Sequence, residues 1–293
     1  MRFARTAVTR GHLRCTAVLL TAALALLAAG CGLLPGRRTP EPAWTQKGVA
    51  AELRGRFRNI RTLKAGDVSL QSSSRVQGIT RETPTLGGVL ALNPHLPGLW
   101  LRTEKLGQQI FTLGVLKNRF WMQIPQTREL VVGGGPAFRK LPYVLRPREL
   151  AALVGSPRQL GLQASSTVFR IHPRQYVFDV WRDENTLARE IFVNRRDLTV
   201  RRVLYYGAQE RVLAEVKLSD YQMVDGIPLP HHLYLHRPQA GVRTHVWLDE
   251  PQINAVPPRQ MRPFFTTPRK PGWRRINLNR QPLSDIKALQ GRE

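Results

Sequence analysis

The side chains best suited to chemistry are four histidines that lie close together in the sequence: His231, His232, His236 and His245. Imidazole nitrogens bind transition metals, and they also act as general acids or bases. On a strand, two histidines four positions apart are separated by about 13 Å, because the rise is about 3.3 Å per residue. That separation is too long for two ligands of one metal ion, so a metal site would require a cross-strand pair.

The residues around these histidines predict a β-hairpin. If residues 237 and 242 close it, the cross-strand pairs on one side are His232 with Trp247, Tyr234 with His245, and His236 with Arg243. The other side carries Leu233, Leu235, Thr244, Val246 and Leu248. The histidines thus face Trp, Tyr and Arg instead of a third metal ligand. We predict no metal site here. Instead, we predict a solvated outer face of polar and aromatic side chains.

Sequence motifs of catalysis are absent from the chain. It has no GxSxG, HExxH, phosphate-binding loop, GxGxxG or CxxC pattern. Asp220, Asp225 and Asp249 lie near the histidines in the sequence, but we expect no nucleophile to be placed beside the histidines. We therefore expect a protein that is not an enzyme and that uses no cofactor.

The N-terminus has the pattern of an export signal. Residues 1–15 hold four arginines and no acidic residue, and fourteen uncharged residues follow. A membrane-spanning helix needs about 20 apolar residues, so this run favours a signal peptide over a permanent span. The small residues Ala28, Ala29 and Gly30 then precede Cys31.

This arrangement resembles a bacterial lipoprotein signal, in which the cysteine is acylated and becomes the first residue of the mature chain. The resemblance implies lipidation of Cys31, with residues 1–30 as the signal peptide. A soluble secreted product and an uncleaved anchor are the alternatives. In such lipoproteins an aspartate after the cysteine usually marks retention in the inner membrane. Gly32 therefore favours the outer membrane, facing the periplasm, with the inner membrane as the alternative.

Composition limits the partners further. The chain carries a net charge of +25, which falls only to +21 without residues 1–30. Export excludes nucleic acid, so the available anions are lipid headgroups and envelope polymers. Arginine far outnumbers lysine, which suits bidentate phosphate contacts, although a GC-rich genome would give the same bias. Cys15 would leave with the signal and Cys31 would carry lipid, so no thiol remains for a disulfide.

The remaining chain is predicted to be one mainly β domain of the α+β type. Residues 31–45 are rich in proline and glycine and indicate a flexible tether. Apolar spacings of three and four predict an amphipathic helix over 46–63 and a second helix over 145–155. Residues 176–249 alternate as a meander of five or six strands, whose short turns require antiparallel pairing. Residues 256–293 are basic, proline-rich and without period, and indicate a tail that lies on the domain or is disordered.

The predicted sheet is apolar on one side, and the two helices can cover that side. Helices that pack loosely on a curved sheet leave an apolar cavity, whereas tight packing gives an ordinary filled core. The sequence alone leaves both possibilities open.

The order of segments resembles the LolA/LolB lipoprotein-carrier superfamily. The matching pieces are GGVLALNPHLPGLWLR, FTLGVLKNRFWMQIPQTRELVVG, DYQMVDGIPLPHHLYLHRP and VWLDEPQIN, within residues 46–255. The resemblance implies an antiparallel, unclosed β-barrel whose concave side is covered by a few helices. It also implies a hydrophobic cavity that takes acyl chains of lipoproteins, and Arg102 as the nearest match to an arginine of the family.

These observations favour a membrane-anchored envelope lipoprotein that binds a lipid or a lipoprotein acyl chain, such as a palmitate chain, and acts in lipoprotein transport to the outer membrane. The candidate lining residues are Trp100, Arg102, Phe111, Leu113, Phe120, Met122 and Phe178. The alternative is a non-catalytic scaffold lipoprotein that binds a protein or an anionic polymer through its sheet and basic tail.

Overall fold

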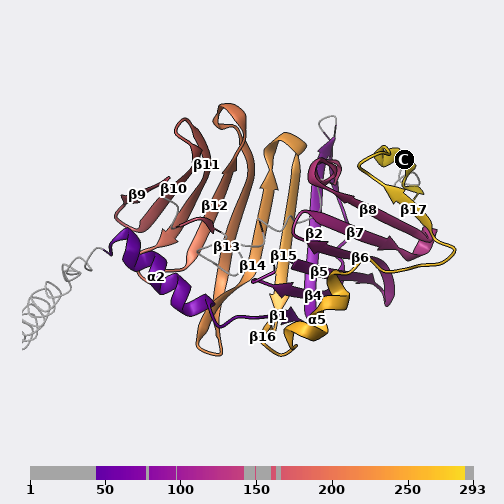
Figure 1. Ribbon diagram of the computed structural model, residues 1–293, viewed down its shortest axis with the longest axis horizontal. Helices are drawn as coiled ribbons and strands as arrows, with labels where there is room; N and C mark the ends of the chain where they lie inside the picture. The colour runs from indigo at the N-terminus through magenta and orange to yellow at the C-terminus, as the bar shows by residue number, and fades with distance from the viewer. Residues whose placement is uncertain are drawn as a thin grey trace, which may run out of the picture. The chain divides into compact units, whose positions relative to one another are not determined.

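Two antiparallel sheets make up most of the described chain (Figure 1). The structure is a computed structural model, and it describes residues 44–76, 79–96, 98–141, 149, 160–162 and 166–287. These residues belong to one compact unit, Trp44–Glu293. Neither sheet closes into a barrel, so the expectation of a mainly β, unclosed antiparallel fold is confirmed. The division into two sheets was not predicted.

The first sheet has eight strands in the order β16-β1-β4-β5-β6-β7-β8-β17. Strands β4 to β8 are consecutive in the chain and joined by short connections, so each pairs antiparallel with the next. The last strand, β17, pairs parallel with β8. The bounds are Gln252–Ile253 (β16), Leu63–Ala65 (β1), Gly87–Asn93 (β4), Gly98–Lys105 (β5), Gln108–Leu116 (β6), Arg119–Ile124 (β7), Glu129–Gly134 (β8) and Arg274–Asn277 (β17).

The second sheet has nine strands in the order β3-β2-β15-β14-β13-β12-β11-β10-β9. Strands β10 to β15 form the predicted meander. The bounds are Ile79–Glu82 (β3), Asp67–Val76 (β2), Val242–Asp249 (β15), Ile227–Arg237 (β14), Val212–Val224 (β13), Val200–Tyr206 (β12), Thr186–Asn194 (β11), Gln175–Asp183 (β10) and Thr167–Ile171 (β9). The 3-10 turns among the described residues are Pro125–Thr127 (η1), Gly135–Lys140 (η2), Ala208–Glu210 (η3) and Pro238–Ala240 (η4), and Leu283–Asp285 (η5) follows β17.

The two sheets share one apolar core. A single cluster of buried side chains takes residues from both, including Leu113 and Phe120 of the first sheet and Phe178 and Leu235 of the second. A two-hydrogen-bond bridge between Leu70 in β2 and Leu86, just before β4, joins the sheets at the backbone. Burial of this apolar surface is the main stabilising term of the fold.

The helix α2 (Gln46–Phe57) is shorter than the predicted helix over 46–63. Thr45 caps its N-terminus by accepting a hydrogen bond from the Gly48 N–H at 3.1 Å. Beyond its end, the Asn254 side chain accepts from the backbone N–H groups of Arg61 and Thr62 at 2.8 and 3.2 Å, and it donates to the Asn59 carbonyl at 2.9 Å. These bonds hold the chain in an extended form, so the helix cannot continue to residue 63.

The basic C-terminal segment is folded onto the first sheet. It contains the helix α5 (Pro258–Phe265), which contacts β4, β5 and β6, and the strand β17. Met261 and Phe265 are buried in a small second cluster, and Phe264 stacks on Trp100 with ring centroids 4.9 Å apart. Of the two alternatives for this tail, the structure has the one in which it lies on the domain. The sequence analysis did not predict the helix α5 or the strand β17.

Two further observations concern helices. The predicted helix over 145–155 lies outside the described residues except for Glu149, which is helical and buried. Among the helices that the structure does describe, none has both the length and the apolar character needed to cross a bilayer.

Gly88 in β4 provides a test of the β4–β5 pairing. A Cβ atom at this position would lie 2.0 Å from the backbone carbonyl oxygen of Arg102, which cannot move without breaking the ladder. We expect Gly88→Ala to lower the free energy of unfolding by about 3 kcal/mol, measured by urea denaturation. Gly87→Ala is the matched control, because its nearest contact would be at 4.0 Å. Equal stability of the two variants would contradict the described register.

Leu106 provides a test of backbone strain. It lies in the β5–β6 turn with its side chain 95% exposed, and its φ of 50° is in the left-handed region. An asparagine adopts this conformation more readily than a leucine. We expect Leu106→Asn to raise the free energy of unfolding by about 1 kcal/mol. Leu106→Ala keeps the strain and is expected to leave stability unchanged; a gain of similar size in that control would mean that strain is not the cause.

Candidate functional site

A row of apolar side chains crosses the inner face of the nine-stranded sheet. Residues directly opposite each other on paired strands share a face. The row runs through Phe178, Ile191, Val203, Val216 and Leu235 and continues to Thr244 and Ser72. Each of the five apolar side chains is 0% exposed. This row therefore forms the apolar wall of the interior on five adjacent strands.

The adjoining row, nearer the β14–β15 turn, brings cationic groups to the same face. On β10 to β13 the opposite residues are Val180, Arg189, Tyr205 and Ala214. Because His236 pairs with Glu215, the next residue of β14, Arg237, continues this row beside Ala214. The Arg237 side chain is only 4% exposed. Two arginines, Arg189 and Arg237, thus lie at this end of the apolar row.

Arg237 makes a buried ion pair with Glu149. Its Nη2 atom lies 2.6 Å from Glu149 Oε2, and the glutamate side chain is 0% exposed. Removing two charges from water costs more free energy than an ion pair of ordinary geometry returns. We therefore do not expect the Arg237–Glu149 pair to be present because it stabilises the fold.

Five of the predicted lining residues lie together in the core. Leu113, Phe120, Met122 and Phe178 are buried members of the shared cluster, and Phe111 packs against it while remaining partly exposed. They come from β6, β7 and β10, so they represent both sheets. The buried four are at most 8% exposed. An apolar guest would therefore have to separate packed side chains to reach them.

Trp100 and Arg102 lie on the opposite face of the first sheet from these five. Their neighbours in β5, Leu99 and Leu101, are the ones that face the core. Trp100 packs instead against α5. The Arg102 side chain is 46% exposed and pairs with Glu104 at 2.5 Å, a surface pair that contributes little stability. The structure does not bring these two residues together with the rest of the predicted set.

The histidine hairpin has the predicted register. His232 pairs with Trp247, Tyr234 with His245, and His236 with Arg243. The rings stack on the partly exposed outer face, with His232 and His245 centroids 5.3 Å apart. Partial burial lowers the pKa of His232, His236 and His245 below the ordinary value. Within the described parts of the chain, no three His, Cys, Asp or Glu side chains are placed to hold a metal ion.

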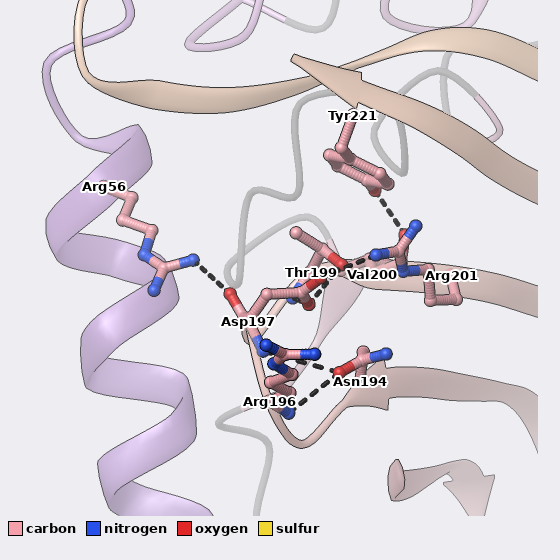
Figure 2. A network of polar contacts seen from close by, with 8 residues as sticks. All are labelled: Arg56, Asn194, Arg196, Asp197, Thr199, Val200, Arg201 and Tyr221. Carbon is pink, nitrogen blue, oxygen red and sulfur yellow. Dashed lines mark hydrogen bonds and ion pairs between the residues drawn. The ribbon is translucent and has the colours of Figure 1, made fainter. Parts of the chain in front are cut away.

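A polar network fixes the C-terminal end of α2 to the β11–β12 turn (Figure 2). Arg56 Nη1 donates to the Asp197 carbonyl at 2.8 Å, and the Asp197 carboxylate accepts from Thr199 and Arg201, both at 2.6 Å. Burial raises the pKa of Asp197, but these bonds and the Arg201 charge outweigh it, so the pKa lies below its ordinary value. Nearby, the Tyr221 hydroxyl donates to a backbone carbonyl of β12. This network holds a helix in place.

Comparison with known proteins rests on structure. No family model matches the sequence, and no curated protein sequence matches it. A DUF1329 family protein from Desulfovibrio piger matches with a TM-score of 0.52 and 11% identity, over 75% of this chain and 95% of that one. A LolA superfamily protein, NE2245 from Nitrosomonas europaea, matches with a TM-score of 0.50 and 10% identity, over 76% and 98%. This chain has a LolA-like fold. The resemblance expected from the sequence is confirmed for the fold.

The buried ion pair of Arg237 and Glu149 was missed by the sequence analysis. Period-two alternation places Arg237 on the same face of β14 as Leu233 and Leu235, so a signal was present in the predicted hairpin. Its partner Glu149 lies 88 positions away in the sequence, and no local pattern connects the two.

Proposed function

We propose that this chain is a membrane-anchored lipoprotein of the bacterial envelope that binds a lipid, or the acyl chains of a lipoprotein, in its apolar interior. The observation that carries the proposal is the single apolar cluster built from the inner faces of both sheets of a LolA-like fold. Phe111, Leu113, Phe120, Met122 and Phe178 are the proposed contacts. We leave out Trp100 and Arg102 because they lie on the other face.

The proposed binding involves no catalysis and no cofactor. The lining side chains are packed against one another. A guest chain that enters must therefore separate them and replace their mutual contacts with contacts to itself. Transfer then depends on the difference in free energy between the donor, the interior and the receiving membrane. Such a carrier would serve lipoprotein localisation to the outer membrane, facing the periplasm.

Acylation of Cys31 is part of the proposal. The mature chain is expected to begin at Cys31 and to carry two or more acyl chains, since a single chain anchors a protein only marginally. Intact mass measurement of the membrane-extracted protein tests this. A mature chain with a free thiol, or one that begins at another residue, would exclude the anchor.

Guest binding is tested with the full chain carrying Cys31→Ser, because this variant has no acyl chain of its own. We expect native mass spectrometry to detect a non-covalent adduct with the mass of a fatty acid or phospholipid, which organic extraction removes. Two results together would end the carrier proposal. The protein would show no adduct after expression in an envelope that supplies these lipids, and it would take up no added lipid.

The basic C-terminal segment supports the second candidate, a scaffold that binds an anionic polymer or a protein. Residues 256–287 hold eight basic residues and one acidic residue. Among the described residues, Arg274 is the one of these eight that has an ion pair, with Glu129. Sedimentation of the Cys31→Ser protein with phosphatidylglycerol vesicles, but not with phosphatidylcholine vesicles, would favour this candidate if no acyl guest is found.

A further inference from the structure

We propose that Arg237 is the anion-binding residue of the interior, and that Glu149 occupies the place taken by the carboxylate or phosphate of an amphiphilic ligand. This inference rests on the proposed function and specifies its ligand class. The ligand would be an anionic amphiphile, either a long-chain carboxylate or a phosphate ester, with its apolar chain along the inner face of the nine-stranded sheet.

The first argument is the position of Arg237. It shares a face of β14 with Leu233 and Leu235, which are 1% and 0% exposed. Three residues spaced two apart on a strand extend over about 13 Å. A ligand chain that lies along β14 would therefore contact an apolar wall before its end reaches the guanidinium. This is the order of groups in an amphiphile.

The second argument is the chemistry of the pair. A guanidinium presents its N–H groups in a planar fork that fits the two oxygens of a carboxylate or phosphate. The Glu149 carboxylate lies 2.6 Å from this fork, so an oxyanion is already bound where the ligand headgroup would go. An anionic ligand that replaces Glu149 keeps the guanidinium compensated. A neutral ligand in that place would remove the Glu149 counter-charge from a guanidinium side chain that is only 4% exposed.

The third argument is that a second arginine lies in the same row of the inner face. Arg189 lies on the same inner face as Tyr205, three strands from Arg237, which corresponds to about 14 Å. A Cβ on Gly161 would lie 3.2 Å from the Arg189 guanidinium, so this partly buried arginine packs against the backbone at Gly161. The inner face therefore carries arginine side chains on β11 and β14 at the same end of the apolar row.

The test compares oleate, oleyl phosphate and oleyl alcohol, which share one chain and differ in headgroup. Binding to the full chain with Cys31→Ser is measured by displacement of a fluorescent fatty acid and by the shift in melting temperature. Glu149→Gln removes the competing carboxylate, and we expect it to bind the two anionic amphiphiles about ten-fold tighter than the parent does. The affinity for oleyl alcohol is expected to remain unchanged.

Two further variants sharpen the test. Arg237→Gln is expected to lose the preference for the anionic ligands over the alcohol. Glu129→Gln is the matched control, because Glu129 is another carboxylate at 0% exposure paired with an arginine, Arg274, at a different edge of the fold. It is expected to bind all three ligands as the parent does.

The outcomes separate this inference from the proposed function. Equal binding of the three amphiphiles by the parent and by Glu149→Gln would overturn the role of Arg237 while leaving an acyl-binding interior. Binding of none of them by any variant would overturn the proposed function and this inference with it. If Arg237→Gln does not fold, Glu149→Gln alone decides, since an unchanged affinity for oleate and oleyl phosphate contradicts the inference. Tighter binding of oleate than of oleyl phosphate, or the reverse, shows whether the ligand headgroup is a carboxylate or a phosphate ester.

Discussion

Replacing Arg237 with methionine is expected to lower the free energy of unfolding by about 3–5 kcal/mol. The substitution keeps the length of the side chain but removes the guanidinium 2.6 Å from Glu149, whose side chain is 0% exposed. The carboxylate then stays in the interior without this counter-charge. Urea denaturation of the Cys31→Ser protein, with and without Arg237→Met, measures the difference.

The double variant Arg237→Met with Glu149→Leu is the control for this prediction. Replacing both members of a buried pair with apolar side chains of similar size is often neutral or stabilising. We therefore expect the double variant to recover most of the lost stability. A loss equal to the sum of the two single substitutions would show that the pair is not coupled. Recovery would mean that the pair is retained for a reason other than stability, such as ligand binding.

Phe178→Ala is the second large effect that we expect, at about 3–5 kcal/mol of unfolding free energy. The ring is 0% exposed at the β10 end of the apolar row, and it packs against Phe169 with centroids 4.9 Å apart. Truncation removes these contacts and leaves a cavity in the wall. Thermal and urea unfolding of the full chain with Cys31→Ser provide the measurement.

Phe192→Ala is the matched control for Phe178→Ala. Phe192 lies on the neighbouring strand but on the outer face, where Arg202 covers its ring at 5.4 Å and part of the side chain is exposed. Its truncation is expected to cost about 1 kcal/mol. Similar losses at the two positions would contradict the assignment of inner and outer faces.

The strands and the register of the hairpin could be predicted because both follow from local rules. Alternation fixes the face of each residue, and a short turn fixes which residues are opposite. The cross-strand pair His232–Trp247 is an example, and the structure has it as predicted. The same alternation separates Trp100 and Arg102 from Leu99 and Leu101. Their inclusion among the lining residues overlooked a signal that the sequence contains.

Long-range features could not be predicted from one sequence. The end of α2 at Phe57 depends on Asn254, whose partners lie nearly two hundred positions earlier. The strand β17 pairs with β8 across more than a hundred residues, and α5 has a proline inside it. No local period marks such pairings, because the contacts that stabilise them come from distant parts of the chain. The charge pair of Arg237 and Glu149 was missed for the same reason.

The parallel pairing of β17 with β8 has a consequence for how the polypeptide matures. β17 begins 140 residues after β8 ends, from Gly134 to Arg274, so this edge of β8 is uncovered while that part of the chain is made. An uncovered strand edge is a template for pairing with another molecule. Chains interrupted before residue 274 should consequently self-associate through β8, which makes the basic C-terminal segment a safeguard against aggregation.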